Sequence, residues 1–166
     1  MNSLGIYFGP KVISVVETNG RKLTNSALIP QSAISTDELE EKVPIEVKAT
    51  GIVSLLRDEL RKLKIGAREA TLCLSGKDLI IRTIEMPEMP RAELESAINF
   101  EVRKYIPFKV EDLISDFQIT LDKQSRTNLV LFVGIKKETL DKYISILNQL
   151  DIKINTIEYS AYSILR

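Results

Sequence analysis

The chain has 166 residues, of which 44% are hydrophobic and 28% are charged, a composition typical of a folded globular protein rather than a disordered tail. Its 23 basic and 23 acidic residues give a formal net charge of zero, which argues against nucleic acid as the main partner because phosphate binding requires a basic excess. With no histidine and one cysteine, Cys73, the sequence excludes histidine-based catalysis and metal sites, and intrachain disulfides.

No apolar run approaches the ~20 residues of a membrane-spanning helix. The first residues lack a basic stretch followed by an apolar one, so we expect no signal peptide.

Residues 1–76 are predicted to form a sheet and one helix. Apolar patterns predict strands at 4–8, 12–18, 22–29 and 70–74. We expect a hairpin turn at Asn19-Gly20 and an acidic surface connection over 30–48. Helical spacing over about 50–64 predicts a helix that ends at Gly66. Strand, helix and strand in this order indicate a parallel pair with a right-handed crossover.

Residues 77–166 are predicted to alternate strands with amphipathic helices. The expected strands are 79–85, 114–121, 129–135 and 152–157. A helix is expected over 136–150, and Ser160 is a candidate cap for a last helix. The turn Ser75-Gly76-Lys77-Asp78 is not a phosphate loop, because the required glycine and lysine spacing is absent.

A further helix, within the stretch 86–108, is the most characteristic element. Its apolar stripe is formed by Leu94, Ala97, Ile98, Val102, Tyr105 and Ile106. Pro90 suits the first helical turn and Glu93 lies near the positive end of the helix dipole. Pro107 is expected to end the helix, because it has no N–H to donate.

The same stretch carries a resemblance to a known family. A strand ending in Met-Pro, a helix with Glu-Leu-x-x-Ala-Ile and the run Lys-Tyr-Ile-Pro-Phe resemble the signature region of PilM, the actin-like family of type IV pilus assembly related to FtsA. The resemblance implies an α/β chain forming the N-terminal half of an actin-like (ribonuclease H-like) fold. Residues 1–76 and 151–166 would be the first actin-like subdomain, and residues 77–150 an inserted strand-helix-strand-strand module.

The N-terminal strand resembles the first phosphate loop of actin-like ATPases, but its ligands are altered. The run Gly5-Ile6-Tyr7-Phe8-Gly9 keeps both glycines, whereas Tyr7 replaces the magnesium-binding Asp and Pro10 a small hydroxyl residue; Lys11 follows. Tyrosine offers no carboxylate to magnesium, and proline removes a backbone donor. We therefore expect no catalysis, no metal site and no cofactor in this chain, although full-length relatives bind ATP and Mg.

PilM-like chains continue for about another domain's length beyond the equivalent of Arg166. We expect this sequence to be either a truncated piece or a reduced relative, without an interdomain nucleotide cleft of its own.

The resemblance implies a protein-interaction scaffold at the cytoplasmic face of the inner membrane, within the assembly platform used for twitching motility. Its expected partner is the N-terminal cytoplasmic peptide of PilN, held between the subdomain and the module. Pilus motor ATPases and other platform proteins are further candidates. The expected partner-binding residues are Ile98, Val102, Tyr105, Pro107 and Phe108.

Three alternatives stay open. One is an actin-like ATP-binding protein that needs a second half. Another is the related cytoplasmic domain of GspL from a type II secretion system, and the third is a structural domain without a partner.

Overall fold

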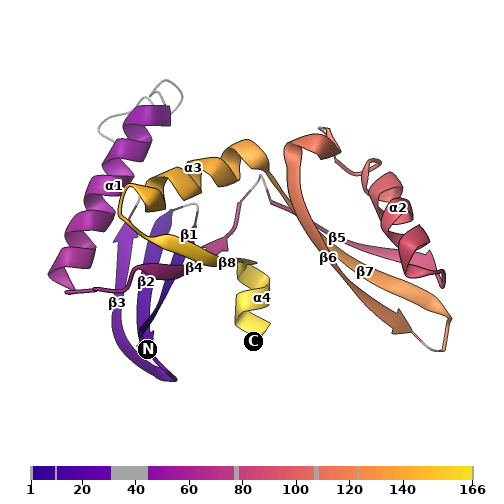
Figure 1. The fold of residues 1–166 in the computed structure, drawn as a ribbon, viewed down its shortest axis with the longest axis horizontal. Helices are drawn as coiled ribbons and strands as arrows, with labels where there is room; N and C mark the ends of the chain where they lie inside the picture. The colour runs from indigo at the N-terminus through magenta and orange to yellow at the C-terminus, as the bar shows by residue number, and fades with distance from the viewer. Residues whose placement is uncertain are drawn as a thin grey trace. The chain divides into compact units, whose positions relative to one another are not determined.

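A computed structural model describes residues 2–9, 11–30, 45–76, 79–106, 109–122 and 124–165. These residues divide into two units, one made of 1–76 and 141–166 and the other of 77–140. Each unit has its own sheet (Figure 1).

The first unit contains a five-stranded sheet in the order β3-β2-β1-β4-β8. Its strands are β1 (Asn2–Phe8), β2 (Val12–Asn19), β3 (Lys22–Pro30), β4 (Glu69–Leu74) and β8 (Lys153–Tyr159). The first three strands form an antiparallel meander, β4 pairs in parallel with β1, and β8 pairs in parallel with β4. The prediction that the two strands joined by the crossover helix pair with each other is wrong, because β4 pairs in parallel with β1 and not with β3, the strand before that helix.

Two helices, α1 (Ile45–Lys62) and α3 (Lys137–Asn148), cover one face of this sheet (Figure 1). That face carries the alternating buried residues of β1, Leu4, Ile6 and Phe8. The Phe8 ring lies 4.7 Å from the Tyr143 ring of α3. A short helix, α4 (Ser160–Leu165), follows β8, and the hydroxyl of Ser163 lies 3.4 Å from Cys73 Sγ.

Helices α1 and α3 end in the same way. After α1, Ile65 N–H donates to Leu60 O at 2.9 Å and Lys64 N–H to Arg61 O at 3.0 Å, with Lys64 at φ +54°. After α3, Ile152 N–H donates to Leu147 O and Asp151 N–H to Asn148 O, with Asp151 at φ +56°. Both are Schellman motifs. Ile65 and Ile152 are the hydrophobic residues that accompany such a motif, and both are buried. The prediction that Gly66 terminates α1 is wrong, because Lys64 takes the left-handed position.

The second unit is a three-stranded antiparallel sheet with one helix. Its elements are β5 (Leu79–Pro87), α2 (Arg91–Val102), a short 3-10 helix (Val110–Asp112), β6 (Leu113–Asp122) and β7 (Thr127–Lys136). The strand order is β5-β7-β6, so β7 lies in the centre. Helix α2 covers one sheet face, and Leu94, Ile98 and Val102 join the core there with residues such as Val130 and Phe132. The chain thus follows the predicted strand-helix-strand-strand order.

Several predicted boundaries differ from the structure. Helix α1 begins at Ile45, five residues before the expected start, and residues 31–44 of the expected connection lie outside the described residues. The first hairpin turn is Gly20-Arg21, because Asn19 pairs with Lys22. Helix α2 starts after Pro90, which is its N-cap, and ends at Val102 in a turn. The second boundary between the units follows Leu140 rather than Leu150, since the larger part of α3 packs on the first sheet.

Candidate functional site

The first turn, where a degenerate phosphate loop was expected, lies against the ring of Tyr7. The Tyr7 hydroxyl lies 2.8 Å from the Ser75 hydroxyl, at the end of β4. A Cβ on Gly9 would lie 2.5 Å from Cε1 of the Tyr7 ring, so this ring occupies the side of the turn next to Gly9. Gly9 N–H donates to Val12 O at 3.0 Å. Lys11 is exposed beside this turn, and Pro10 lies outside the described residues.

Two of the five residues predicted to bind a partner are in the core. Ile98 is 0% exposed and Val102 is 1% exposed, and both pack between α2 and its sheet. That part of the prediction is wrong, because residues at i and i+4 on the covered face of α2 cannot meet a partner in the folded protein. Tyr105 is 49% exposed, with its hydroxyl 3.5 Å from Glu101 Oε1. Pro107 and Phe108 lie outside the described residues.

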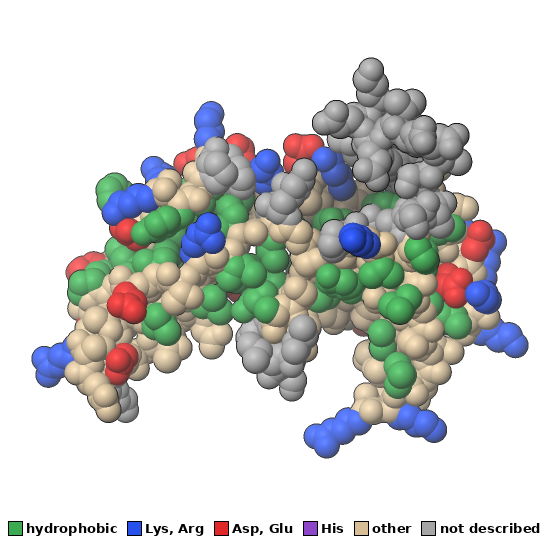
Figure 2. All heavy atoms as spheres, turned by 180° about the vertical axis from the view of Figure 1, so that it is seen from behind, with side chains coloured by type: hydrophobic (Ala, Val, Ile, Leu, Met, Phe, Trp, Pro, Cys, Tyr) green, Lys and Arg blue, Asp and Glu red, His purple; other side chains and the backbone are tan. Residues whose placement is uncertain are grey.

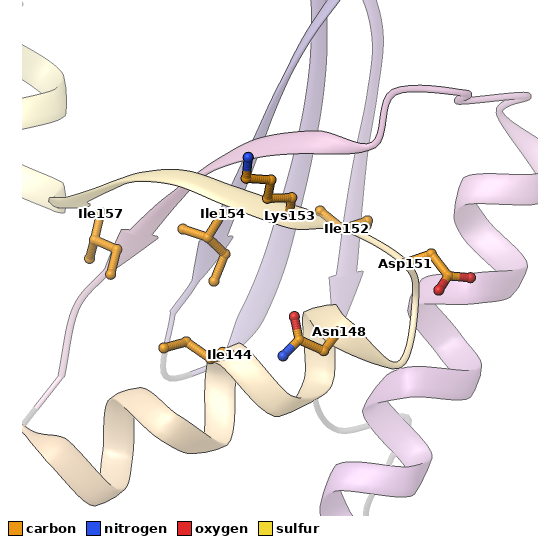
Figure 3. Close-up of a pocket in the computed structure, with 7 residues that line it drawn as sticks. All are labelled: Ile144, Asn148, Asp151, Ile152, Lys153, Ile154 and Ile157. Carbon is orange, nitrogen blue, oxygen red and sulfur yellow. The ribbon is translucent and has the colours of Figure 1, made fainter.

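A groove that the sequence analysis did not anticipate runs between α3 and β8, within the first unit. It has a volume of about 660 Å³ and is lined by Ile144, Asn148, Asp151, Ile152, Lys153, Ile154 and Ile157. In Figure 3, Ile154 and Ile157 of β8 point toward α3, where Ile144 and Asn148 face them. The groove therefore has an apolar middle and polar groups from Asn148, Asp151 and Lys153 in its lining.

The groove adjoins a free sheet edge. β8 is the last strand of its sheet, so one of its edges has no strand partner in the part of the chain that the structure describes. A bulge at Asn155 shifts the pairing, since Ala70 pairs with Ile154 and Thr71 with Thr156. The extra residue brings Ile154 and Ile157 to the same face, although they are three positions apart. A free edge beside an apolar groove is the arrangement that binds an extended peptide as an added strand.

Carboxylates and the thiol do not form a metal site in the described ranges, which contain no cluster of three or more His, Cys, Asp or Glu residues suited to an ion. Glu17 is the one ionisable side chain that is buried there, and its carboxylate accepts hydrogen bonds from Asn2, Thr24 and Asn25. The hydrogen bond from Asn25 is the largest cause of its lowered pKa. We interpret Glu17 as a structural residue, because neighbouring side chains already donate hydrogen bonds to its carboxylate.

Comparison with known proteins identifies the family. The sequence model of the family described as "Type IV pilus assembly protein PilM" matches residues 5–166. The chain belongs to this PilM family. The recognition that the sequence signature at 86–108 suggested is therefore confirmed.

Two solved structures share the fold. The PilM-PilN type IV pilus biogenesis complex matches with a TM-score of 0.76 at 22% identity, covering 97% of this chain and 48% of that chain. The cytoplasmic domain of EpsL, an inner membrane component of the type II secretion system of Vibrio cholerae, matches with a TM-score of 0.64 at 15% identity, covering 96% of this chain and 57% of that chain. The sequence spans about half the length of these relatives.

These likenesses confirm the predicted fold class, a mixed α/β chain that shares the fold of about half of each of these proteins. None of the helices in the described ranges is both long and apolar enough to cross a membrane. Within the PilM family fold, the candidate binding surfaces of this chain are thus the groove between α3 and β8 and the exposed Tyr105 at the end of α2.

Proposed function

We propose that this chain is a protein-interaction scaffold for type IV pilus assembly that binds the N-terminal cytoplasmic segment of PilN. Its place would be the cytoplasmic face of the inner membrane. Membership of the PilM family supports the assembly role. The similar PilM structure is that of a complex with PilN, which makes PilN the partner of that protein. In this proposal the first unit is the first actin-like subdomain and the second unit is the inserted module.

The observation that carries the proposal is the apolar groove at the free edge of β8. An extended segment would pair its backbone with β8 and insert alternate side chains beside Ile144, Ile154 and Ile157. Backbone hydrogen bonds would supply affinity, and the width of the apolar middle would supply specificity. Tyr105, exposed on the second unit, is a further candidate contact.

We also propose that the chain has no ATPase activity of its own. Tyr7 fills the side of the first turn where a nucleotide-binding relative needs a carboxylate, and Gly9 N–H is already bonded. A ligand that binds only the native state raises its melting temperature. We therefore expect Mg-ATP to leave the melting temperature unchanged, and a clear rise would contradict the proposal.

The decisive experiment is a calorimetric titration with a synthetic peptide of the N-terminal segment of PilN from the same organism. We expect micromolar binding, about −8 kcal/mol. Ile157→Asp should weaken it by about tenfold or more, because a carboxylate would enter the apolar middle of the groove. Ile114→Asp on β6 is a matched control, since Ile114 and Ile157 are 46% and 44% exposed isoleucines in strands.

Equal losses in the two variants, or none in Ile157→Asp, would reject the groove as the binding site. A peptide methylated at alternate backbone nitrogens tests the strand pairing directly, because methylation removes donors without changing side chains. Unchanged affinity of that peptide would rule out an added strand. The likeness to EpsL is one of fold alone and does not by itself support a role in type II secretion.

A further inference from the structure

The hairpin of β2 and β3 combines cationic and apolar side chains at its free end. Its turn is Gly20-Arg21, which is followed by Lys22 and Leu23. All four residues are exposed. Gly20 has φ +60° while Arg21 does not adopt a positive φ, which is the pattern of a type II′ turn. Asn2, the first residue of β1, pairs with Asn19, so the turn extends beyond β1.

Within the part of the chain that the structure describes, no carboxylate neutralises these two cations. In the described ranges neither Arg21 nor Lys22 has a carboxylate within ion-pair distance. The nearest acid along the hairpin, Glu17, is engaged by Asn2, Thr24 and Asn25 instead. The tip therefore presents two positive charges that no described carboxylate offsets, although the whole chain is neutral.

Hydrophobic side chains continue from the tip along one face of the hairpin. Leu23 pairs with Thr18 and Leu28 with Ser14, so both lie on the sheet face opposite the buried Ile13. Leu23 is 56% exposed and Leu28 is 72% exposed. Figure 2 shows this hairpin with basic side chains at its end and hydrophobic side chains above them.

The base of the hairpin is fixed, so the tip is presented in a defined position. The carboxylate of Glu17 on β2 accepts hydrogen bonds from Asn2 Nδ2 of β1 at 3.1 Å and from Asn25 Nδ2 of β3 at 2.8 Å. Thr24 Oγ1 also donates to the Glu17 backbone carbonyl at 2.9 Å, at the bulge between Glu17 and Thr18. Three strands thus share one carboxylate immediately below the turn.

We propose that this tip contacts the surface of an anionic lipid bilayer. Anionic headgroups attract basic residues near a membrane surface, and this attraction is screened by salt. An exposed leucine next to the two cations gains by entering the acyl boundary, which a purely ionic partner such as nucleic acid would not offer. The contact is separate from the peptide groove and would add to any anchoring through a partner, because linked sites raise the effective concentration of one another.

Vesicle flotation of the whole chain tests the proposal. We expect it to float with phosphatidylcholine vesicles containing about a quarter phosphatidylglycerol, and much less so when salt is raised from about 50 mM to about 500 mM. The double variant Arg21→Ser/Lys22→Ser should lose about tenfold of the bound fraction. The matched control is Arg61→Ser/Lys62→Ser, which removes two exposed cations from the end of α1. Loss of flotation in the control as well, or no flotation of the unaltered chain, would overturn the proposal.

A fluorescence measurement reports insertion independently of bound fraction. The chain has no tryptophan, so Leu23→Trp introduces a single reporter at the tip. We expect its emission to shift to shorter wavelength with anionic vesicles. Phe100→Trp, at an exposed position on α2, should show no shift. A shift in both variants, or in neither, would reject insertion by the hairpin.

Discussion

The two units cover their sheets differently. In the first unit, α1 and α3 lie on one face, and α4 contacts the other face at Cys73. In the second unit, α2 lies on one face, and the described residues supply no helix for the opposite one (Figure 1). Yet the central strand β7 is apolar on both sides, with Val130 and Phe132 toward α2 and Leu131 and Val133 away from it.

Strands that are apolar on both sides are typical of sheets covered on both faces. The second unit therefore exposes apolar surface that a strand of this composition normally buries, and Leu129 near the start of β7 is 42% exposed. In the first unit a helix lies against each face of the sheet, whereas in the second unit the face of β7 away from α2 keeps apolar side chains without a helix from the described residues.

The largest expected effect comes from Ile98→Ala in the core of the second unit. Truncating a fully buried isoleucine leaves a cavity, and we expect the free energy of unfolding to fall by about 2–5 kcal/mol. Phe100→Ala on the exposed side of α2 is the control and should change it by less than about 0.5 kcal/mol. Urea unfolding measures both variants. A small effect of Ile98→Ala would mean that α2 is not the covering layer of this unit.

Substituting valine by threonine on the two sides of β7 tests the comparison within one strand. Val130→Thr buries a hydroxyl among apolar side chains and should cost about 1–3 kcal/mol. Val133→Thr lies on the side without a helix and should cost less than about 0.5 kcal/mol, because water can reach the hydroxyl. Equal costs would indicate that the face away from α2 is covered in solution, and urea unfolding distinguishes the two outcomes.

Local periodicity predicted the strands and helices well, because alternation and helical spacing depend on neighbouring residues alone. One departure arises where an extra residue enters a ladder, and another arises at a helix end. The bulge between Glu17 and Thr18 accompanies a hairpin turn one residue later than the Asn-Gly pair indicated. Gly66 was a natural expectation for a helix end, but the Schellman motif requires only a positive φ, which Lys64 adopts.

The candidate groove could not be predicted for the same reason. Strict alternation places Ile154 and Ile157 on opposite faces, and only the bulge at Asn155 brings them together. The free edge of β8 depends on the strand order, which sequence patterns do not reveal. A pair of isoleucines flanking polar residues in the last strand was the available signal. The burial of Ile98 and Val102, in contrast, follows directly from the apolar stripe of α2.

The units also differ in their buried polar side chains, which gives a prediction about pH. In the described ranges these are Glu17 in the first unit, 4% exposed, and Asn128 in the second, 6% exposed. Hydrogen bonds, chiefly from Asn25, hold the pKa of Glu17 below its usual value of 4.5. Asn128 donates to Pro87 O at 3.1 Å and does not titrate.

A lowered folded-state pKa means that the unfolded state binds the proton more readily. The stability contributed by Glu17 is therefore fully present above pH 4.5 and is lost as the pH falls through its folded pKa. Glu17→Gln should cost about 1–3 kcal/mol at neutral pH, because its donors lose a charged acceptor, and should flatten the acid dependence. Hydrogen exchange of β2 and β7 at pH 7 and in acid measures this. If acid lowered the exchange protection of β2 and β7 equally, the loss of stability in acid could not be assigned to Glu17.

The smallest effects concern strained backbone positions, one at a helix end and one at a hairpin. Lys64 in the first unit and Arg126 in the β6–β7 turn of the second have φ of +54° and +53°. A left-handed backbone conformation costs a residue with a side chain about 1–2 kcal/mol, and glycine avoids this cost. Glycine also makes the unfolded chain more flexible, which lowers the free energy of unfolding by about 0.4–1 kcal/mol. Lys64→Gly and Arg126→Gly should each stabilise by about 0.5–1 kcal/mol, whereas Lys62→Gly within α1 should destabilise by about 1 kcal/mol. Thermal unfolding of the three variants would separate the cases. If Lys64→Gly stabilises and Arg126→Gly does not, the turn of the second unit takes another conformation in solution, and the register of β7 that defines its two faces would have to be revised.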